Sequence, residues 1–276
     1  MIIEEVKKIL RRKQCYLILG LFLIGVFVDF IITCLHYKSA PLSTIPSAYD
    51  LIIINNDFGT PASMIFSTFI FFLAISIISS DILFDEVRIG LSSSIITRES
   101  TKKYIVSKMM AIAITVFFIT IIPLFINQLL SVIAFPVQGK VSGVITYNEL
   151  MPADPDRILS YLENFHPYIN IVIFILLRGI AATVTALFAF SLTFIEHVSK
   201  FFILLAPMLY YICYSIIKSF IQDLISDTRA QEIVDTDILN VNGYGSIYAM
   251  IFFLLIQIII GVMVIRNGLK NEVIAL

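Results

Sequence analysis

The sequence predicts an all-α membrane protein with six membrane-spanning helices and both termini on the cytoplasmic side. Three observations lead to this fold class. First, 59% of the 276 residues are hydrophobic and the mean hydropathy is +0.95, whereas only about half of the residues in soluble domains are apolar. Second, six apolar runs approach or exceed the roughly 20 residues that a helix needs to cross a bilayer. Third, lysine and arginine residues gather in alternate connecting segments.

Residues 1–13 are expected to form an interfacial helix that lies along the lipid headgroups. Apolar and charged side chains alternate here with helical spacing. One face would hold Ile2, Ile3, Val6, Ile9 and Leu10, and the other would hold Glu4, Lys7, Lys8, Arg11 and Arg12. Such a helix buries its apolar face at the acyl boundary and keeps its basic face near anionic lipid.

The six apolar runs are expected to be the membrane spans. They are residues 15–35, 61–80, 105–135, 167–194, 201–217 and 247–265. Pro123 removes a backbone donor inside the third span, which predicts a kink or break there. Asp29 lies near the outer end of the first span, where its side chain is expected to reach water. Residues 220–225 have helical apolar spacing, which predicts a small separate helix on the outer membrane face.

The distribution of basic residues gives the expected orientation. Thirteen lysine and arginine residues lie in the N-terminal segment, in the segment between the second and third spans, in the turn 196–200 and in the C-terminal tail. The three opposite loops contain four. Because basic residues are retained in the cytoplasm, both termini should be cytoplasmic in a multi-pass protein of the cell membrane. The whole chain, residues 1–276, is expected to be a single membrane domain.

Motifs of several functional classes are missing from the sequence. There is no Gly-x-x-x-x-Gly-Lys-Ser/Thr loop, so the chain is not expected to bind ATP by that device. A net charge of −1 gives no indication of nucleic-acid binding. The three cysteines and three histidines are scattered without metal-ligand spacing, so no metal or cofactor is expected on this chain. Asp81, Asp85 and Glu86 are a candidate metal cluster, but neighbouring basic residues favour a solvated helix face.

Polar and aromatic side chains inside the spans have two interpretations each. Arg178 costs about 2.5–3.5 kcal/mol to place in lipid, so it should face protein or a water-filled cavity. It is a candidate residue of the substrate path that contacts an anionic group, or it makes a structural contact within the protein or with a partner. A set of aromatic residues either lines a hydrophobic exit path or serves packing and interfacial anchoring. The set comprises Phe66, Phe69, Phe71, Phe72, Tyr210, Tyr211 and Tyr214.

Residues 81–108 form a polar segment between two apolar runs and are the main candidate for a functional site. The segment contains five basic and four acidic residues, so it should lie in water or on another protein. Within it, residues 87–96 can form a short helix with Val87, Leu91 and Ile95 on one face. A short amphipathic helix between two spans needs a protein surface to rest on, and a separate motor subunit would supply one.

This segment and its flanks resemble the permease subunits of ABC-2 type transporters. The similar residues are Glu86-x-x-x-Gly90-Leu91, then an apolar turn, Arg98-Glu99-Ser100 and Tyr104-x-x-x-Lys108. The family's Leu-Leu-x-x-Pro stretch is replaced by Ile95-Ile96-Thr97-Arg98, without the proline. The layout is similar too, with an amphipathic N-terminal helix, six spans and a partly helical outer segment between the last two.

The resemblance implies partners and a function. In that family the segment is a coupling loop, here residues 81–104, that docks on an ATPase subunit. The candidate coupling residues are then Glu86, Val87, Gly90, Leu91, Ile95 and Arg98. ATP and Mg²⁺ would be bound by the partner, and this chain would not be an enzyme. It would form a homodimer, or a heterodimer with a second permease, within the membrane lipid. The dimer would export an amphipathic substrate such as an antimicrobial peptide, a lipid or a drug.

Two other classes of protein are alternatives. A membrane immunity or sensing protein would sequester a ligand without transporting it. An intramembrane enzyme would use Asp81, Asp85 and Glu86. Co-purification of an ATPase subunit would support the permease and count against both alternatives.

Overall fold

The computed structural model describes residues 2–41, 45, 47–49, 51, 53, 71–88, 101–137, 166–195, 198–224 and 247–270. At 81–88, 167, 218, 221–224 and 247–250 only the backbone is described. This part of the chain forms seven α-helices and no β-strand, which confirms the predicted all-α class for it. The helices are α1 (Ile2–Leu10), α2 (Lys13–Tyr37), α4 (Phe71–Arg88), α6 (Thr101–Ala134), α9 (Pro167–Leu192), α10 (Lys200–Leu224) and α12 (Ile247–Lys270).

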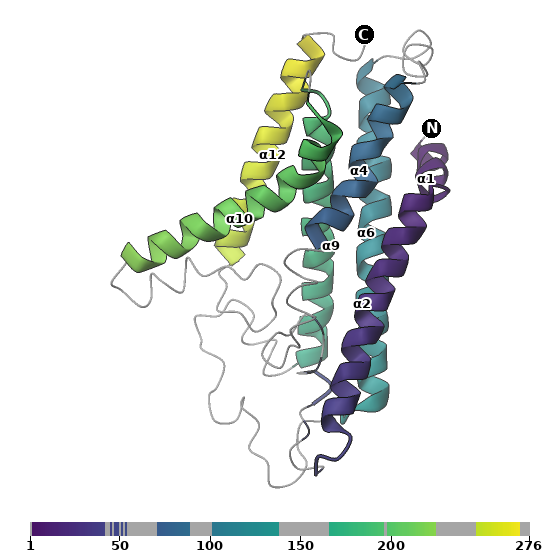
Figure 1. The fold of residues 1–276 in the computed structure, drawn as a ribbon, viewed down its shortest axis with the longest axis vertical. Coiled ribbons are helices and arrows are strands. Elements are labelled where there is room, and N and C mark those ends of the chain that lie inside the picture. The colour runs from purple at the N-terminus through teal and green to yellow at the C-terminus, as the bar shows by residue number, and fades with distance from the viewer. Residues whose placement is uncertain are drawn as a thin grey trace.

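Five of these helices form an elongated bundle in which α6 and α9 are central. The helix α6, of 34 residues, packs along α9 and α2, while α4 and α12 pack on α9. The helices α4, α9 and α12 run toward the end of the bundle where α1 lies, and α2 and α6 run away from it (Figure 1). We call this the α1 end and the opposite one the far end. The helix α10 leaves the α1 end obliquely and projects from the bundle (Figure 1).

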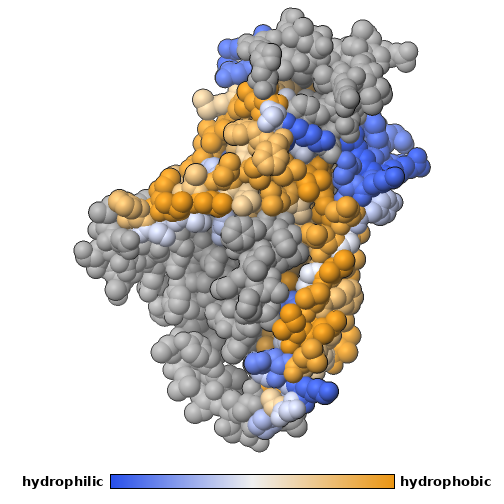
Figure 2. Space-filling model, in the orientation of Figure 1, coloured by the Kyte–Doolittle hydropathy of each residue, from blue (hydrophilic) through white to orange (hydrophobic). Residues whose placement is uncertain are grey.

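The predicted multi-pass character is supported by the length and composition of the helices. Among the described residues, five helical segments are long and apolar enough to cross a membrane. They are Lys13–Tyr37, Thr101–Ala134, Tyr168–Leu192, Lys200–Ile217 and Ile251–Lys270. The second predicted span is described only from Phe71, so six spans remain a prediction. Exposed apolar side chains cover α2, α10 and α12, and hydrophilic residues of α1 border this hydrophobic surface (Figure 2).

The helices α4 and α10 extend furthest beyond the predicted ends of their spans. The helix α4 continues past Ser80 to Arg88, so the first eight residues of the polar segment are helical. The helix α10 is continuous to Leu224, so Phe220–Leu224 form its last turn, and the predicted separate helix beginning at Phe220 is wrong. In both cases no glycine or proline follows the apolar run, and charged residues such as Asp, Arg and Lys are tolerated in helices.

Two expectations about residues inside the spans need correction. The helix α6 is continuous through Pro123, so the helix does not break there, and a kink at this proline stays a prediction. Asp29 is 4% exposed and does not reach water. Its neighbour Phe30 packs on Phe135, with 6.4 Å between the ring centroids, so one face of α2 is covered by protein here.

The described members of the aromatic set attach α10 to the bundle. Tyr211 stacks on Phe72 of α4, with 4.6 Å between ring centroids and an interplanar angle of 28°. Tyr210 and Tyr214 each lie 4.9 Å from the ring of Phe253 of α12. The Tyr210 hydroxyl also donates to the Phe253 carbonyl at 3.0 Å. These contacts fit the packing interpretation; the other two members of the set lie outside the described residues.

Candidate functional site

The predicted coupling residues lie at the edge of the described part of the chain. Glu86 and Val87 belong to the last turn of α4, where only the backbone is described. The other four lie outside the described residues: Gly90, Leu91, Ile95 and Arg98. The docking face on this segment therefore stays a prediction.

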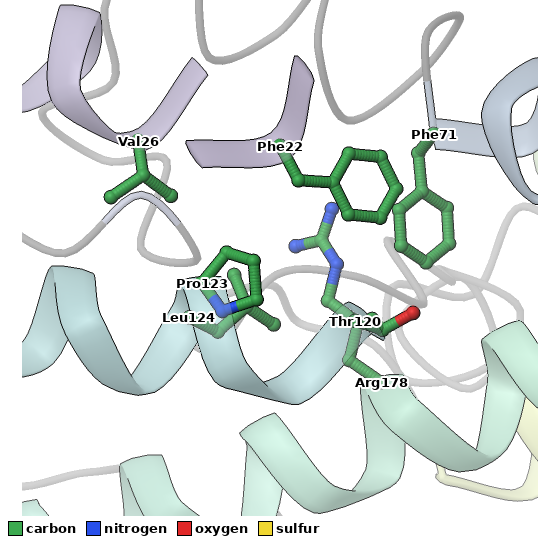
Figure 3. A pocket seen from close by; sticks show the side chains of 7 residues that line it. All are labelled: Phe22, Val26, Phe71, Thr120, Pro123, Leu124 and Arg178. Atoms are coloured by element: carbon green, nitrogen blue, oxygen red, sulfur yellow. The ribbon is translucent and has the colours of Figure 1, made fainter. Parts of the chain in front are cut away.

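Arg178, a candidate either for the substrate path or for a structural contact, lies inside the bundle and is 5% exposed. Its side chain extends from α9 past Thr120 toward the rings of Phe22 and Phe71 (Figure 3). The guanidinium carbon is 5.0 Å from the Phe71 ring centroid, and Phe71 stacks on Phe22 at 6.0 Å. A cation over an aromatic face gains about 2 kcal/mol when both are desolvated. Arg178 therefore faces protein, as predicted, and connects α9 to α4.

A small cavity lies beside the guanidinium. Its lining residues come from α2, α4, α6 and α9 (Figure 3). They are Phe22, Val26, Phe71, Thr120, Pro123, Leu124 and Arg178. The volume is about 10 Å³, which is room for about one water molecule.

A glycine lets α6 and α9 approach closely at this level. A Cβ atom on Gly179 would lie 2.6 Å from Cγ2 of Ile121, so no larger side chain fits without a shift. One turn further along α9, the Thr183 hydroxyl donates to the Gly179 carbonyl at 2.8 Å and lies 3.5 Å from the Ala113 carbonyl of α6. Together these contacts fix the antiparallel register of the two helices.

Polar side chains follow the buried side of α6 along most of its length. They are Ser107, Lys108, Thr115, Thr120, Asn127, Gln128 and Ser131, and all are buried. At 1.5 Å per residue, the rise along α6 from Lys108 to Ser131 is about 35 Å. This length exceeds the roughly 30 Å hydrocarbon core of a bilayer. Of these residues the sequence analysis singled out only Lys108, in the polar segment, and missed the others. A detectable signal was the seven-residue spacing of Lys108 and Thr115, and of Thr120 and Asn127, which keeps each pair on one helix face.

Two asparagines occur near the far end of this helix pair. The α6–α9 register brings Asn127 and Asn170 to the same level, and each is 1% exposed. The Ile53 backbone N–H donates to Asn127 Oδ1 at 3.0 Å, and Asn170 Nδ2 donates to the Tyr49 hydroxyl at 3.3 Å. Among the described residues, Asn127 Nδ2 and Asn170 Oδ1 have no hydrogen-bond partner. Because buried amides normally have partners, this donor and acceptor are notable.

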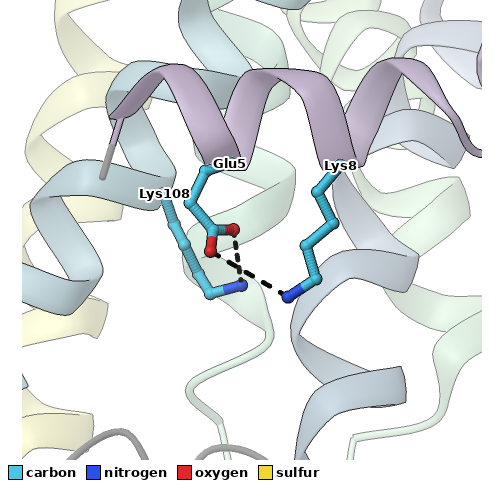
Figure 4. A network of polar contacts seen from close by, with 3 residues as sticks. All are labelled: Glu5, Lys8 and Lys108. Atoms are coloured by element: carbon cyan, nitrogen blue, oxygen red, sulfur yellow. Dashed lines mark hydrogen bonds and ion pairs between the residues drawn. The ribbon is translucent and has the colours of Figure 1, made fainter.

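An ion pair lies at the α1 end of the bundle, where the buried polar residues of α6 begin. Lys108 is fully buried, and its Nζ lies 3.5 Å from Glu5 Oε2 and 5.0 Å from the Tyr104 ring centroid. Lys8 approaches the same carboxylate at 3.9 Å, so Glu5 contacts two ammonium groups (Figure 4). With Val6 and Ile9 packed into the core, this pair attaches α1 to α6. The predicted interfacial helix is therefore docked on the bundle.

The candidate acidic cluster of α4 cannot be compared with a metal site, because the side chains of Asp81, Asp85 and Glu86 are not described. Among the described residues, no group of three or more His, Cys, Asp or Glu side chains has a geometry that holds a metal ion.

Comparisons of the chain with protein-family models, with curated proteins and with solved structures found no match.

Proposed function

We propose that this chain is the membrane-spanning permease subunit of an ATP-driven exporter, and that a separate ATPase subunit drives it. The proposal is supported by helices of span length, by the amphipathic helix α1 docked at one end, and by a polar segment that emerges at that same end. The residues that resemble ABC-2 type permeases lie in this polar segment, between Glu86 and Lys108.

The observation that carries the proposal is the way α4 and α6 enter the polar segment. The helix α4 continues without a break from its apolar part to Arg88, and α6 begins at Thr101. Only residues 89–100 separate these two rigid helices. A subunit that moved this connection would therefore displace both helices, and α6 would carry the packing of α1, α2 and α9 with it.

The rest of the assembly follows from the same proposal. Both termini lie in the cytoplasm, and the chain spans the cell membrane. ATP and Mg²⁺ are bound by the ATPase subunit, and this chain binds no cofactor and no nucleic acid. Two permease chains, identical or different, enclose the path between them. The substrate is amphipathic, as a peptide, a lipid or a drug is, because the chain has both exposed hydrophobic surfaces and buried polar groups in its spans.

Co-purification tests the proposal. An affinity-tagged chain, expressed from its own chromosomal locus and extracted in mild detergent, should bring down a subunit with a phosphate-binding loop in a 1:1 ratio. The same preparation should hydrolyse ATP, whereas the chain purified alone should not. The ligand-sequestering and enzymatic alternatives predict a chain that works without an ATPase, so full function of the isolated chain would overturn the proposal.

A further inference from the structure

Part of the loop after α2 is buried against the far end of the bundle. Its described residues Ser47, Ala48, Tyr49, Leu51 and Ile53, here called the plug, are at most 8% exposed. Loops normally run over the surface, because their backbone polar groups need water or other partners. A buried loop segment therefore requires hydrogen bonds from the helices that cover it.

Those hydrogen bonds come from α6, from the residues just after it, and from α9. The Ala48 N–H donates to the Pro136 carbonyl at 2.8 Å, just beyond the end of α6. The Ile53 N–H donates to Asn127 Oδ1 at 3.0 Å, so a side-chain amide of α6 binds a main-chain amide of the loop. On α9, the side-chain amide of Asn170 donates to the Tyr49 hydroxyl.

The side-chain amides of Asn127 and Asn170 contain hydrogen-bonding groups that the plug does not use. Asn127 Nδ2 is a donor and Asn170 Oδ1 is an acceptor, and neither has a hydrogen-bond partner among the described residues. A secondary amide carries one acceptor and one donor, its C=O and its N–H, and so complements this pair. All these groups are neutral, so they suit a neutral amide better than a phosphate or a carboxylate.

We propose that Asn127 and Asn170 form a binding site for the main-chain amides of a peptide, and that the plug occupies this site in the present structure. The inference rests on the proposed function and narrows its substrate to peptides. The plug acts as a tethered competitor, which a peptide must displace. Because the plug belongs to the same chain as the site, its effective concentration there is in the millimolar range, and a free peptide competes with it only at millimolar concentration or above.

A synthetic copy of the plug is the probe that tests the site. The peptide Ser-Ala-Tyr-Asp-Leu-Ile-Ile, fluorescently labelled and amidated at its C-terminus, matches residues 47–53. Its control peptide carries an N-methyl group on the backbone nitrogen that corresponds to Ile53. This change removes the N–H that donates to Asn127 Oδ1. The chain is used alone in lipid nanodiscs, as wild type and as Ala48→Asp. Ala48 is fully buried, so an aspartate there should expel the plug.

The Ala48→Asp variant should bind the peptide at least about tenfold more tightly than the wild type, because the competitor is removed. N-methylation should weaken this binding about tenfold, because it leaves a buried acceptor unpaired. Adding Asn127→Leu should abolish the difference between the two peptides, whereas Thr115→Val, a buried change elsewhere on α6, should preserve it. The proposal is overturned if both peptides bind equally well. It is also overturned if no peptide binds to an Ala48→Asp chain that has wild-type helicity and the wild-type elution volume in size-exclusion chromatography.

A second measurement uses the wild-type chain and does not depend on the variant folding. Hydrogen exchange of fragments containing residue 53 should accelerate when about 10 mM unmodified peptide displaces the plug, in keeping with the plug's effective concentration. The N-methylated peptide should leave that exchange unchanged. Unchanged exchange with both peptides contradicts the site. Neither assay contains an ATPase, so the two proposals can fail separately. If the peptide binds as expected but the co-purification experiment recovers no ATPase, the proposed exporter is refuted and the peptide site stands.

Discussion

The ammonium of Lys108 lies 3.5 Å from the Glu5 carboxylate, and this contact joins the N-terminal helix to the central helix of the bundle. Lys108 is fully buried and the Glu5 side chain is 14% exposed, so water screens the pair only weakly. Removing one partner of such a pair leaves the other buried charge uncompensated. The ion pair is therefore expected to determine whether α1 stays docked on α6.

The first prediction concerns this ion pair. Glu5→Gln should destabilise the chain by about 3 kcal/mol, because Lys108 loses its counter-charge. Denaturant titration in mixed micelles would measure the loss. Glu4→Gln is the matched control: Glu4 pairs with Lys7 at 3.5 Å with both side chains largely exposed, and its loss should cost at most about 1 kcal/mol. In the double variant Glu5→Leu with Lys108→Met, most of the stability should return. Equal effects of Glu5→Gln and Glu4→Gln would show that the buried pair contributes nothing special.

The second prediction concerns the contact of α6 with α9. Gly179→Ala should destabilise the bundle by about 1–3 kcal/mol, because its Cβ would lie 2.6 Å from Ile121 Cγ2. Gly20→Ala is the control, because nothing lies within 4 Å of a Cβ there. That change should stabilise α2 by about 0.5–1 kcal/mol through helix propensity. The same titration reports both, and a stable Gly179→Ala variant would mean that α6 and α9 are further apart.

Much of the fold was predictable from the sequence because a bilayer restricts the choices. A long apolar run must satisfy its backbone internally, so a helix was the expected form of each span, and Lys13–Tyr37 was predicted within two residues at either end. The ends of α4 and α10 were predicted less well. Hydropathy falls at Asp81 and Lys218, but a helix ends where its hydrogen bonds end, and charged residues do not end them.

The candidate site was less predictable, because it depends on contacts between distant residues. The cost of a charge in lipid was enough to place Arg178 against protein. Its aromatic neighbour Phe71, more than a hundred positions away, follows from the packing of α4 on α9, which no local pattern encodes. Asn127 and Asn170 share a level through the α6–α9 register, to which the close contact at Gly179 contributes.

A third prediction tests the contact between Arg178 and Phe71. Arg178→Ala should destabilise the bundle by about 2 kcal/mol or more, since it removes the cation over the ring and leaves a void. Arg178→Lys should be better tolerated, because an ammonium can still interact with the ring. Phe71→Leu should lose much of the same stability, and the double variant should lose less than the sum of the two. Thermal unfolding in detergent and assembly with the ATPase provide the readouts. Wild-type behaviour of Arg178→Ala would show that the charge is incidental.

The fourth prediction concerns topology. In a background with Cys15, Cys34 and Cys213 replaced by serine, single cysteines at Ser142 and Asp235 should react with an impermeant maleimide on intact cells. A cysteine at Ser93 should react only after permeabilisation. The reason is the concentration of basic residues in the N-terminal and 81–108 segments, which holds them in the cytoplasm. Labelling of the Ser93 variant from outside would reverse the orientation and remove the basis for coupling.

The last prediction concerns the connection between α4 and α6. If Leu91 lies on the face that docks on the ATPase, Leu91→Asp places a charge in a desolvated protein contact. Loss of a central interface contact costs about 2 kcal/mol or more, so ATPase binding should weaken at least about tenfold. Membrane insertion should survive, because the change touches neither described end of the two helices, Arg88 and Thr101. Ser142→Asp, in a predicted outer loop, is the control that adds the same charge elsewhere. ATPase co-purification and export are measured for both variants. An inserted Leu91→Asp chain that keeps its ATPase and exports at the wild-type rate would show that this segment does not couple the two subunits.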